Sequence, residues 1–391
     1  MRFLSYVMPP VMQRLSHRWF AWRDRLLMSP AFQRFALDFR PTRFIARRRS
    51  RQLFDLCAGF VYSQVLLAVV RLRLLEQVRG GPLPLSRLRT ALDLPPDGAL
   101  RLVKAAVSLG LLERRAAAPG PDQQSGDAYG LGEVGAALLG NPGVLALIEH
   151  HGLVYPDLED PVALLRGAAP RTHMADYWPY AGSSDPAALE PDAVRRYTDV
   201  MSASQALIAA EVLAAWPLDD HRSLLDVGGG DGQFLRAVAA RYPHLALALF
   251  DLPGVIDLAG PRFAAAGLGD RVQLTGGNVF VQPLPAGADL ITLVRVLHDH
   301  DDDAALAILR AAHAALPAGG TLLIAEPMAG SRGAEAVADA YFGFYLLAMG
   351  SGRARTPAEL GRLAGAAGFG PLRLLPARAP LLTRVAILRH H

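Results

Sequence analysis

The residues best suited to chemistry stand where apolar, strand-like runs end. Leu224–Val227 leads directly into Gly228-Gly229-Gly230-Asp231-Gly232, and a helix is expected from about Gln233. Glycines there let the backbone turn sharply and approach a bound nucleoside closely. A dinucleotide fingerprint needs Gly or Ala where this chain has Gln233, so the motif favours a nucleoside without a pyrophosphate. The pattern suggests S-adenosylmethionine as cofactor; an ordinary tight strand-to-helix turn is the alternative.

The next two strand ends carry groups that could hold such a nucleoside. Asp251 can accept hydrogen bonds from both ribose hydroxyls, although it could instead cap the following helix. Asn278 can contact the adenine amino group, and Val279 can pack on the purine. The predicted cofactor-binding residues are Asp226, Gly228, Gly230, Asp251, Leu252, Asn278, Val279 and Arg295.

A histidine follows the fourth predicted strand, and a glutamate ends the fifth. His298 could take a proton from a reacting hydroxyl, since an imidazole titrates near neutral pH. Glu326 could accept the other ring N–H and fix the tautomer; a salt bridge to an arginine is its alternative role. Metal binding by the His/Asp cluster is the weaker reading, because Asp301–Asp303 suit the start of the next helix. We therefore expect His298 and Glu326 as catalytic residues and no metal.

Alternating strands and helices from Ser223 onward predict an α/β domain with a mostly parallel sheet. Strands are expected at 223–227, 245–250, 272–275, 290–294, 321–325, 371–375 and 382–388. A long helix over about 192–216 should lead into this domain.

Before it, residues 51–115 have a helical pattern and are followed by a hairpin-like loop, which predicts a winged-helix-like module. Such modules often bind DNA. The candidate recognition helix, 97–109, carries only Arg101 and Lys104 as basic residues. A dimer interface is therefore favoured over nucleic-acid binding.

The first 51 residues are basic and aromatic. They carry twelve arginines against Asp24 and Asp38, roughly +10, with tryptophans and phenylalanines between them. This composition suits the surface of an anionic membrane, and equally an arm that packs on a partner subunit. The apolar run Leu56–Val70 is expected to be too short to span a bilayer. The single cysteine, Cys57, excludes an internal disulfide and suits a reducing cytoplasm.

Four motifs together resemble the S-adenosylmethionine-dependent O-methyltransferases of the plant caffeate and flavonoid type and their bacterial relatives: Asp226–Gly232, Phe250–Pro253, Leu297–Asp299 and Ala325-Glu326. The resemblance implies a class I (Rossmann-like) methyltransferase domain preceded by a winged-helix-like dimerisation domain. It also implies that His298 is the base, that Glu326 orients it, that Asp251 binds the cofactor and that the chain forms a homodimer. The implied segments are an extension over 1–50, a dimerisation domain over 51–140, a helical linking region over 141–216 and the catalytic domain over 217–391.

A narrower resemblance lies in Leu53–Gln64, His150–Gly167 and His298–Asp302. These segments are similar to the carotenoid 1-hydroxyl O-methyltransferases of purple phototrophic bacteria. They imply a lipophilic substrate, an acyclic carotenoid, and a cytoplasmic enzyme with peripheral contact to the photosynthetic membrane. A phenolic or polyketide acceptor, a winged-helix regulator and a non-catalytic ligand-binding protein are the alternatives.

Three positions depart from the plant pattern. Ala354 replaces a second acid that faces the catalytic histidine, His300 replaces a tryptophan, and Asn278 replaces an aspartate. Loss of a carboxylate should lower the proton affinity of the histidine and make the pocket less polar.

Overall fold

A computed structural model describes residues 10–116, 127–177, 202, 205–378 and 383–391, the side chains of residues 10–16 excepted. The chain forms two compact units, Met1–Val69 and Val70–His391.

The first unit is helical: α1 spans Pro10–Met28, α2 spans Pro30–Asp38, and α3 spans Arg40–Arg71 and continues into the second unit. Ser29 begins α2 as its N-cap, accepting from the Phe32 N–H. The unit exposes large apolar side chains, among them Trp19, Phe20, Trp22, Phe35, Phe39, Phe44, Leu53, Phe54, Leu56 and Phe60.

The apolar run at the end of α3 is part of a longer helix than the sequence suggests, Arg40–Arg71 with 32 residues. This helix is long and apolar enough to cross a membrane by length and composition, and only 17% of its apolar window is buried. Length and composition are weak evidence, because core helices of soluble proteins and signal sequences pass the same test. The expectation that the run is too short is wrong.

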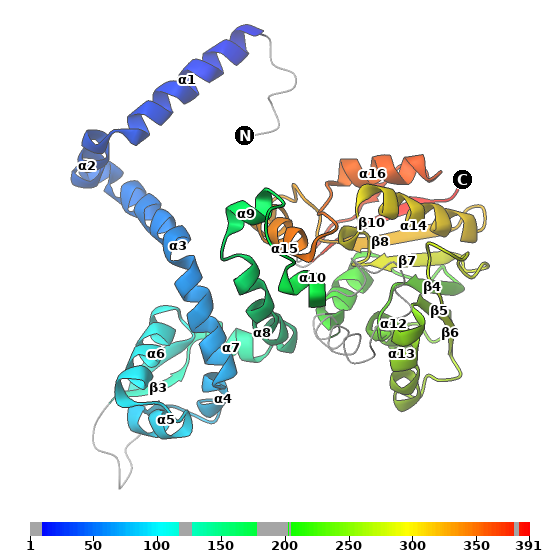
Figure 1. Cartoon of the computed structure of the whole chain (residues 1–391), viewed down its shortest axis with the longest axis horizontal. Coiled ribbons are helices and arrows are strands. Elements are labelled where there is room, and N and C mark those ends of the chain that lie inside the picture. Colours follow the sequence, from blue (N-terminus) through cyan, green and yellow to red (C-terminus); the bar gives the residue numbers. More distant parts are fainter. Residues whose placement is uncertain (1–9, 117–126, 178–201, 203–204, 379–382) are drawn as a thin grey trace. The chain divides into compact units, whose positions relative to one another are not determined.

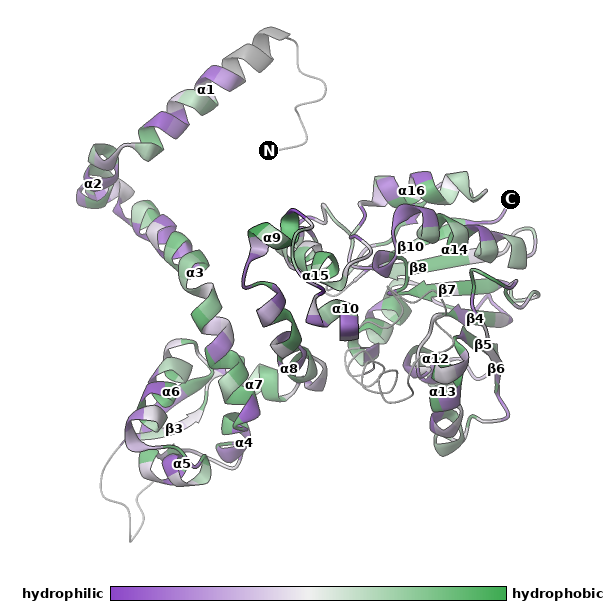
Figure 2. Ribbon diagram, in the orientation of Figure 1, coloured by the Kyte–Doolittle hydropathy of each residue, from purple (hydrophilic) through white to green (hydrophobic). Residues whose placement is uncertain are grey.

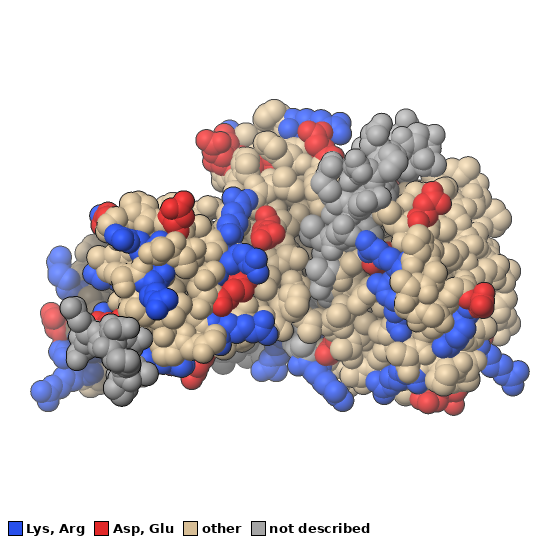
Figure 3. Space-filling model, turned by 90° about the horizontal axis from the view of Figure 1, so that it is seen from below, with Lys and Arg blue, Asp and Glu red and all other residues tan. Residues whose placement is uncertain are grey.

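The second unit begins with the predicted winged-helix-like module. Its helices are α4 (Leu74–Gln77), α5 (Leu85–Ala91), α6 (Pro96–Ser108) and α7 (Glu133–Leu139). A small antiparallel sheet has the order β1 (Leu83–Pro84), β3 (Asp127–Leu131), β2 (Leu112–Ala116). On the candidate recognition helix α6, Arg101 is paired with Asp97 of the same helix at 2.7 Å. Basic and acidic side chains are both scattered over the face shown in Figure 3, and most of that face carries neither.

Short helices connect the module to the α/β domain: α8 (Pro142–Asp157), α9 (Pro161–Leu165) and α10 (His173–Tyr177). The predicted helix over 192–216 is described only in part, as a helix over Gln205–Ala215. Its earlier residues, except 202, lie outside the described part of the chain.

The large sheet has seven strands in the order β6-β5-β4-β7-β8-β10-β9. Their bounds are β4 Ser223–Val227, β5 Ala246–Asp251, β6 Val272–Gly276, β7 Leu290–Val294, β8 Thr321–Glu326, β9 Arg373–Leu374 and β10 Arg384–Arg389. The first five in this order are parallel, and β10 runs antiparallel between β8 and β9. The strand order reverses between β4 and β7, which is where α/β sheets open a crevice for ligands.

Helices cover both faces of this sheet (Figure 1). On one face, α12 (Gln233–Arg241), α13 (Pro253–Ala265) and the 205–215 helix share one apolar core. On the other, α14 (Asp302–Ala315) and α16 (Pro357–Ala366) share a second. The central strands are apolar along their length, as Figure 2 shows, because both of their faces are buried. Because β4 to β8 are parallel, their carboxyl ends lie at one edge of the sheet.

Candidate active site

The glycine turn after β4 adopts backbone angles that favour glycine. Gly230 and Gly232 have φ of +62° and +78°. A Cβ on Gly232 would lie 2.1 Å from the Phe263 ring, so the turn can pack on α13 only without one. The Gly230 N–H donates to Asp251 Oδ2 at 2.8 Å, which ties the turn to the end of β5.

Two backbone hydrogen bonds hold the carboxylate of Asp251 in place and leave it able to accept others. Its Oδ1 accepts from the Leu252 N–H at 2.7 Å, and Oδ2 accepts from Gly230. Burial raises the pKa of Asp251 to about 6, against the lowering effect of these two hydrogen bonds. The N-cap of α13 is Leu252, so Asp251 does not have the capping role that was its alternative. Each carboxylate oxygen keeps capacity for a ribose hydroxyl.

Asp226, predicted to bind the cofactor, does not line the pocket. It is fully buried, and its Oδ1 accepts from Thr292 Oγ1 at 2.6 Å. Burial raises its pKa to about 7. A Cβ on Gly229 would lie 2.1 Å from Asp226 Oδ2. Asp226 therefore supports the turn from beneath.

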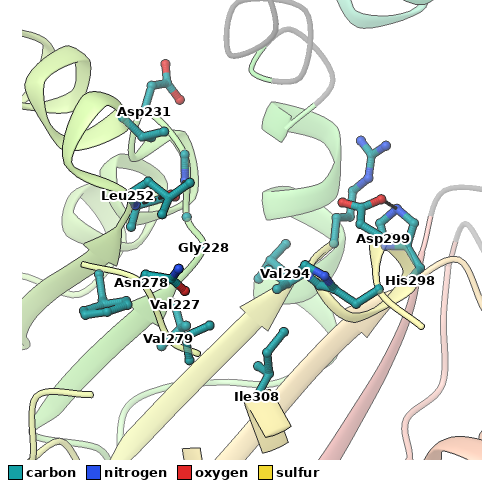
Figure 4. A pocket seen from close by; sticks show the side chains of 18 of the residues that line it. Val227, Gly228, Asp231, Leu252, Asn278, Val279, Val294, His298, Asp299 and Ile308 are labelled. Atoms are coloured by element: carbon teal, nitrogen blue, oxygen red, sulfur yellow. Dashed lines mark hydrogen bonds and ion pairs between the residues drawn. The ribbon is translucent and has the colours of Figure 1, made fainter. Parts of the chain in front are cut away.

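One pocket joins these groups to the end of β7 (Figure 4). Gly228, Leu252 and Asn278 lie on its left side in Figure 4, and His298 and Asp299 lie on its right side. Asn278 Oδ1 accepts from the Phe280 N–H at 2.9 Å, and a carbonyl oxygen can accept a second bond. The other predicted cofactor residues that line the pocket are Gly230, Asp251, Val279 and Arg295. The left side therefore offers a carboxylate, an amide and apolar walls, a donor and acceptor set that fits adenosine.

His298 lies in η2, a short 3-10 helix over Leu297–Asp299 directly after β7, and is 4% exposed. Its Nδ1 contacts Glu326 Oε2. Glu326 Oε1 accepts from two backbone N–H groups, Val296 at 3.0 Å and Leu297 at 2.8 Å. Glu326 does not line the pocket; it stands behind the imidazole and fixes its orientation. Its ion pair in the described residues is with His298, not with an arginine.

Asp299 also lines the pocket and faces the imidazole, although it is not among the predicted catalytic residues. Its Oδ1 lies 3.2 Å from His298 Nε2, so both ring nitrogens face carboxylates. Burial alone would lower the pKa of His298, but the charges of Asp299 and Glu326 outweigh burial and raise it. Burial raises the pKa of Asp299 itself to about 6. The expected loss of proton affinity through Ala354 is thus offset by a carboxylate next to the histidine in sequence.

Arg295 has φ of +59°, a left-handed conformation that is costly for a residue with a Cβ. Its N–H donates to Ala325 O at 2.8 Å, which holds the end of β7 against β8. The guanidinium charge lowers the pKa of His298, opposing the two carboxylates.

The acidic run after His300 stands at the start of α14 as expected, with Asp301 at the N-cap position and Asp302 and Asp303 in the first turn. The Asp301 side chain accepts from the Gly352 N–H at 3.0 Å and makes no capping bond. Asp302 instead pairs with Arg353 and Arg355, both at 2.9 Å. The run therefore fastens the 351–356 loop to the site. No group of three potential metal ligands occurs within the described ranges.

His300 lines the pocket and meets the Phe280 ring edge-on at 5.6 Å. Burial lowers its pKa to about 4, so the imidazole is neutral. The position that carries tryptophan in the plant pattern thus remains an uncharged, flat wall.

Comparison with known proteins decides the family. Residues 155–370 match the O-methyltransferase domain, and residues 54–141 match the O-methyltransferase dimerisation domain. The chain belongs to the O-methyltransferase family. It is 41% identical to the demethylspheroidene O-methyltransferase of Cereibacter sphaeroides, over 91% of both chains. It is 40% identical to that of Rhodobacter capsulatus, over 87% of this chain and 82% of the relative.

Human N-acetylserotonin methyltransferase, solved with S-adenosylmethionine, has the same fold, with a TM-score of 0.67 at 22% identity over 87% of this chain and 97% of that chain. The expected class I fold is confirmed. The protein is an S-adenosylmethionine-dependent O-methyltransferase whose dimerisation domain supports a homodimer, and the family supports a cytoplasmic location. The regulator alternative is wrong.

Proposed function

We propose that the acceptor is the tertiary 1-hydroxyl of an acyclic carotenoid of the demethylspheroidene type. The observation that carries this proposal is the 41% identity, over 91% of both chains, to an enzyme that bears that substrate in its name. An apolar ring next to the proposed base agrees with an apolar acceptor: Phe342 meets the His298 ring edge-on, with ring centroids 5.8 Å apart. Met349 is buried in the apolar cluster against which Phe342 packs.

His298 is the proposed base. When bound, S-adenosylmethionine supplies a methyl group that is already activated by a positive sulfur. Asp251, Leu252 and Asn278 would hold the adenosine in the pocket that His298 also lines. A tertiary alcohol is too weak an acid to ionise first, so its proton passes to His298 Nε2 during or after attack. Glu326 and Asp299 stabilise the resulting imidazolium, while alignment and exclusion of water lower the barrier.

We further propose that the basic segment contacts an anionic membrane, where a carotenoid is dissolved. Exposed aromatics such as Trp19, Trp22 and Phe44 lie among arginines, as membrane-surface helices require. The exposed apolar part of α3 from Phe54 onward falls inside the 54–141 dimerisation match, and we assign it to the partner subunit.

The division into segments 1–50, 51–140, 141–216 and 217–391 remains part of this proposal. The family matches over 54–141 and 155–370 support its second and fourth segments.

The test is product analysis with the purified protein, methyl-labelled S-adenosylmethionine and a hydroxylated acyclic carotenoid in detergent. We expect labelled methyl ether from the carotenoid and little from a simple phenol or an aromatic polyketide supplied in parallel. Transfer to the phenol or the polyketide alone would refute the carotenoid acceptor and leave the family assignment intact.

A further inference from the structure

Two histidine–tyrosine hydrogen bonds join α8 to the segment after β8. That segment is η3, a π-helix over Ala336–Tyr341, followed by α15 over Phe342–Met349. His150 Nε2 lies 2.9 Å from Tyr345 Oη, and His151 Nε2 lies 2.9 Å from Tyr341 Oη. Each pair joins an imidazole to a tyrosine hydroxyl, and the two histidines are adjacent in the chain. The pairs differ in their position relative to the pocket.

Only Tyr345, among these four residues, lines the pocket that holds His298 and Asp299. Its ring stacks on Tyr341 at 5.8 Å and meets Phe342 at 6.1 Å, and Phe342 in turn meets His298. Burial has the largest effect on the pKa of Tyr345 and raises it. Tyr341 and Asp299 raise it further, so the hydroxyl stays protonated. Tyr345 therefore lines the same pocket as His298, and its hydroxyl is held by His150.

The tautomer of His150 decides what this hydroxyl can do. Burial, with a smaller effect of His151, lowers the pKa of His150 to about 4, so the ring is neutral and carries one N–H. His150 Nδ1 is buried and makes no hydrogen bond within the described part of the chain. A bare buried acceptor is tolerated better than a bare buried N–H, so the proton belongs on Nε2. His150 then donates to Tyr345, and the tyrosine's own proton is available to the pocket.

We propose that Tyr345, oriented by His150, donates a hydrogen bond to the acceptor oxygen and thereby selects oxygen over nitrogen nucleophiles; this inference rests on the proposed function. An alcohol oxygen has one proton and two lone pairs. Its proton goes to His298, one lone pair attacks the methyl carbon, and the second accepts from Tyr345. A neutral amine has only one lone pair, which it needs for attack, so it cannot accept the hydrogen bond from Tyr345.

Tyr345→Phe removes the donor and keeps the ring. We expect KM for the hydroxylated carotenoid to rise about ten-fold, the effect of one hydrogen bond, with a smaller change in kcat. Preference for the hydroxylated polyene over its amino analogue should fall by a similar factor. Tyr341→Phe is the matched control: it deletes the neighbouring bond of the same kind and should change neither quantity.

His150 is tested by its substitutions. His150→Phe should approach the Tyr345→Phe kinetics, and His150→Gln, whose amide can donate to Tyr345, should restore most of the acceptor affinity. Calorimetric affinity for S-adenosylhomocysteine should match that of the wild type in every variant, which verifies that the nucleoside site is folded.

Two results would overturn the inference alone: wild-type KM and selectivity in Tyr345→Phe, or an equal loss in Tyr341→Phe. A wild-type protein that binds S-adenosylhomocysteine but methylates no carotenoid hydroxyl would overturn the proposed function, and this inference with it.

Discussion

The residues of the site show how one imidazole is prepared for proton transfer. Glu326 contacts Nδ1 from behind and is itself fixed by backbone N–H groups, so it sets the orientation. Asp299 lies 3.2 Å from Nε2, the atom that must receive the proton. Arg295 opposes the two carboxylates. The proton affinity of His298 is thus the balance of three charges and burial.

Asp299→Asn tests this balance through pH. A histidine acts as a base only when neutral, so kcat/KM falls as the pH drops through its pKa. Asp299 and Glu326 raise that pKa above its usual 6.5. Removing the Asp299 charge lowers it, so the acidic limb of the kcat/KM profile should move to lower pH.

The matched control is Asp303→Asn, a carboxylate on the first turn of α14. Its acidic limb should coincide with that of the wild type. A limb that stays in place in Asp299→Asn, or moves to higher pH, would contradict the proposed balance of charges.

At the scale of elements, the glycine turn leads from β4 into α12 and is hydrogen-bonded to the end of β5. It forms the nucleoside side of the pocket. Gly230 has φ of +62° and no atom near its Cβ position, and it lines the pocket. Gly333 has φ of +79° and equally open surroundings, but it does not line the pocket. Substitutions at these two glycines can therefore distinguish the cost of backbone strain from the effect on ligand binding.

Gly230→Ala and Gly333→Ala should each cost about 1 kcal/mol of unfolding free energy, since both place a Cβ in a left-handed conformation. Only Gly230→Ala should also weaken S-adenosylhomocysteine binding, by about ten-fold or more. Denaturant unfolding and calorimetry measure the two effects. Equal affinity in both variants would show that the nucleoside does not approach the turn closely.

The sequence predicts where the strands begin and end better than it predicts which strands are adjacent in the sheet. Strand composition and the glycine turn locate β4 to β8 to within a residue or two, because buried parallel strands are continuously apolar. The insertion of β10 between β8 and β9 is not visible in the sequence, since hydropathy carries no strand order. The strand expected over 371–375 is shorter in the structure, where β9 spans Arg373–Leu374.

The same limit applies to the site. His298, Glu326 and Asp251 could be predicted because each ends a strand at the same sheet edge. Tyr345 could not, because its partner His150 lies 195 residues away in sequence. Asp226 was predicted to bind the cofactor because motif position does not distinguish a pocket residue from the support beneath it.

The whole molecule combines an O-methyltransferase domain with a basic N-terminal unit. Removing residues 1–45 deletes α1, α2 and the first arginines of α3, and it leaves every described pocket residue in place. We expect the truncated protein to lose co-sedimentation with anionic vesicles and to keep its affinity for S-adenosylhomocysteine.

Neutral vesicles are the control for charge, and added salt should release the full-length protein, because exposed arginine contacts are screened. If the truncated protein sediments with anionic vesicles as the full-length chain does, the membrane role of this segment is wrong.

The central claim is that His298 receives the proton of the hydroxyl that is methylated. Turnover of His298→Gln at saturating S-adenosylmethionine, with nucleoside affinity measured on the same sample, tests it most directly. We expect turnover to fall by about 10²–10⁴-fold while S-adenosylhomocysteine still binds with wild-type affinity. Near-normal turnover in that variant, with the nucleoside bound, would contradict the mechanism.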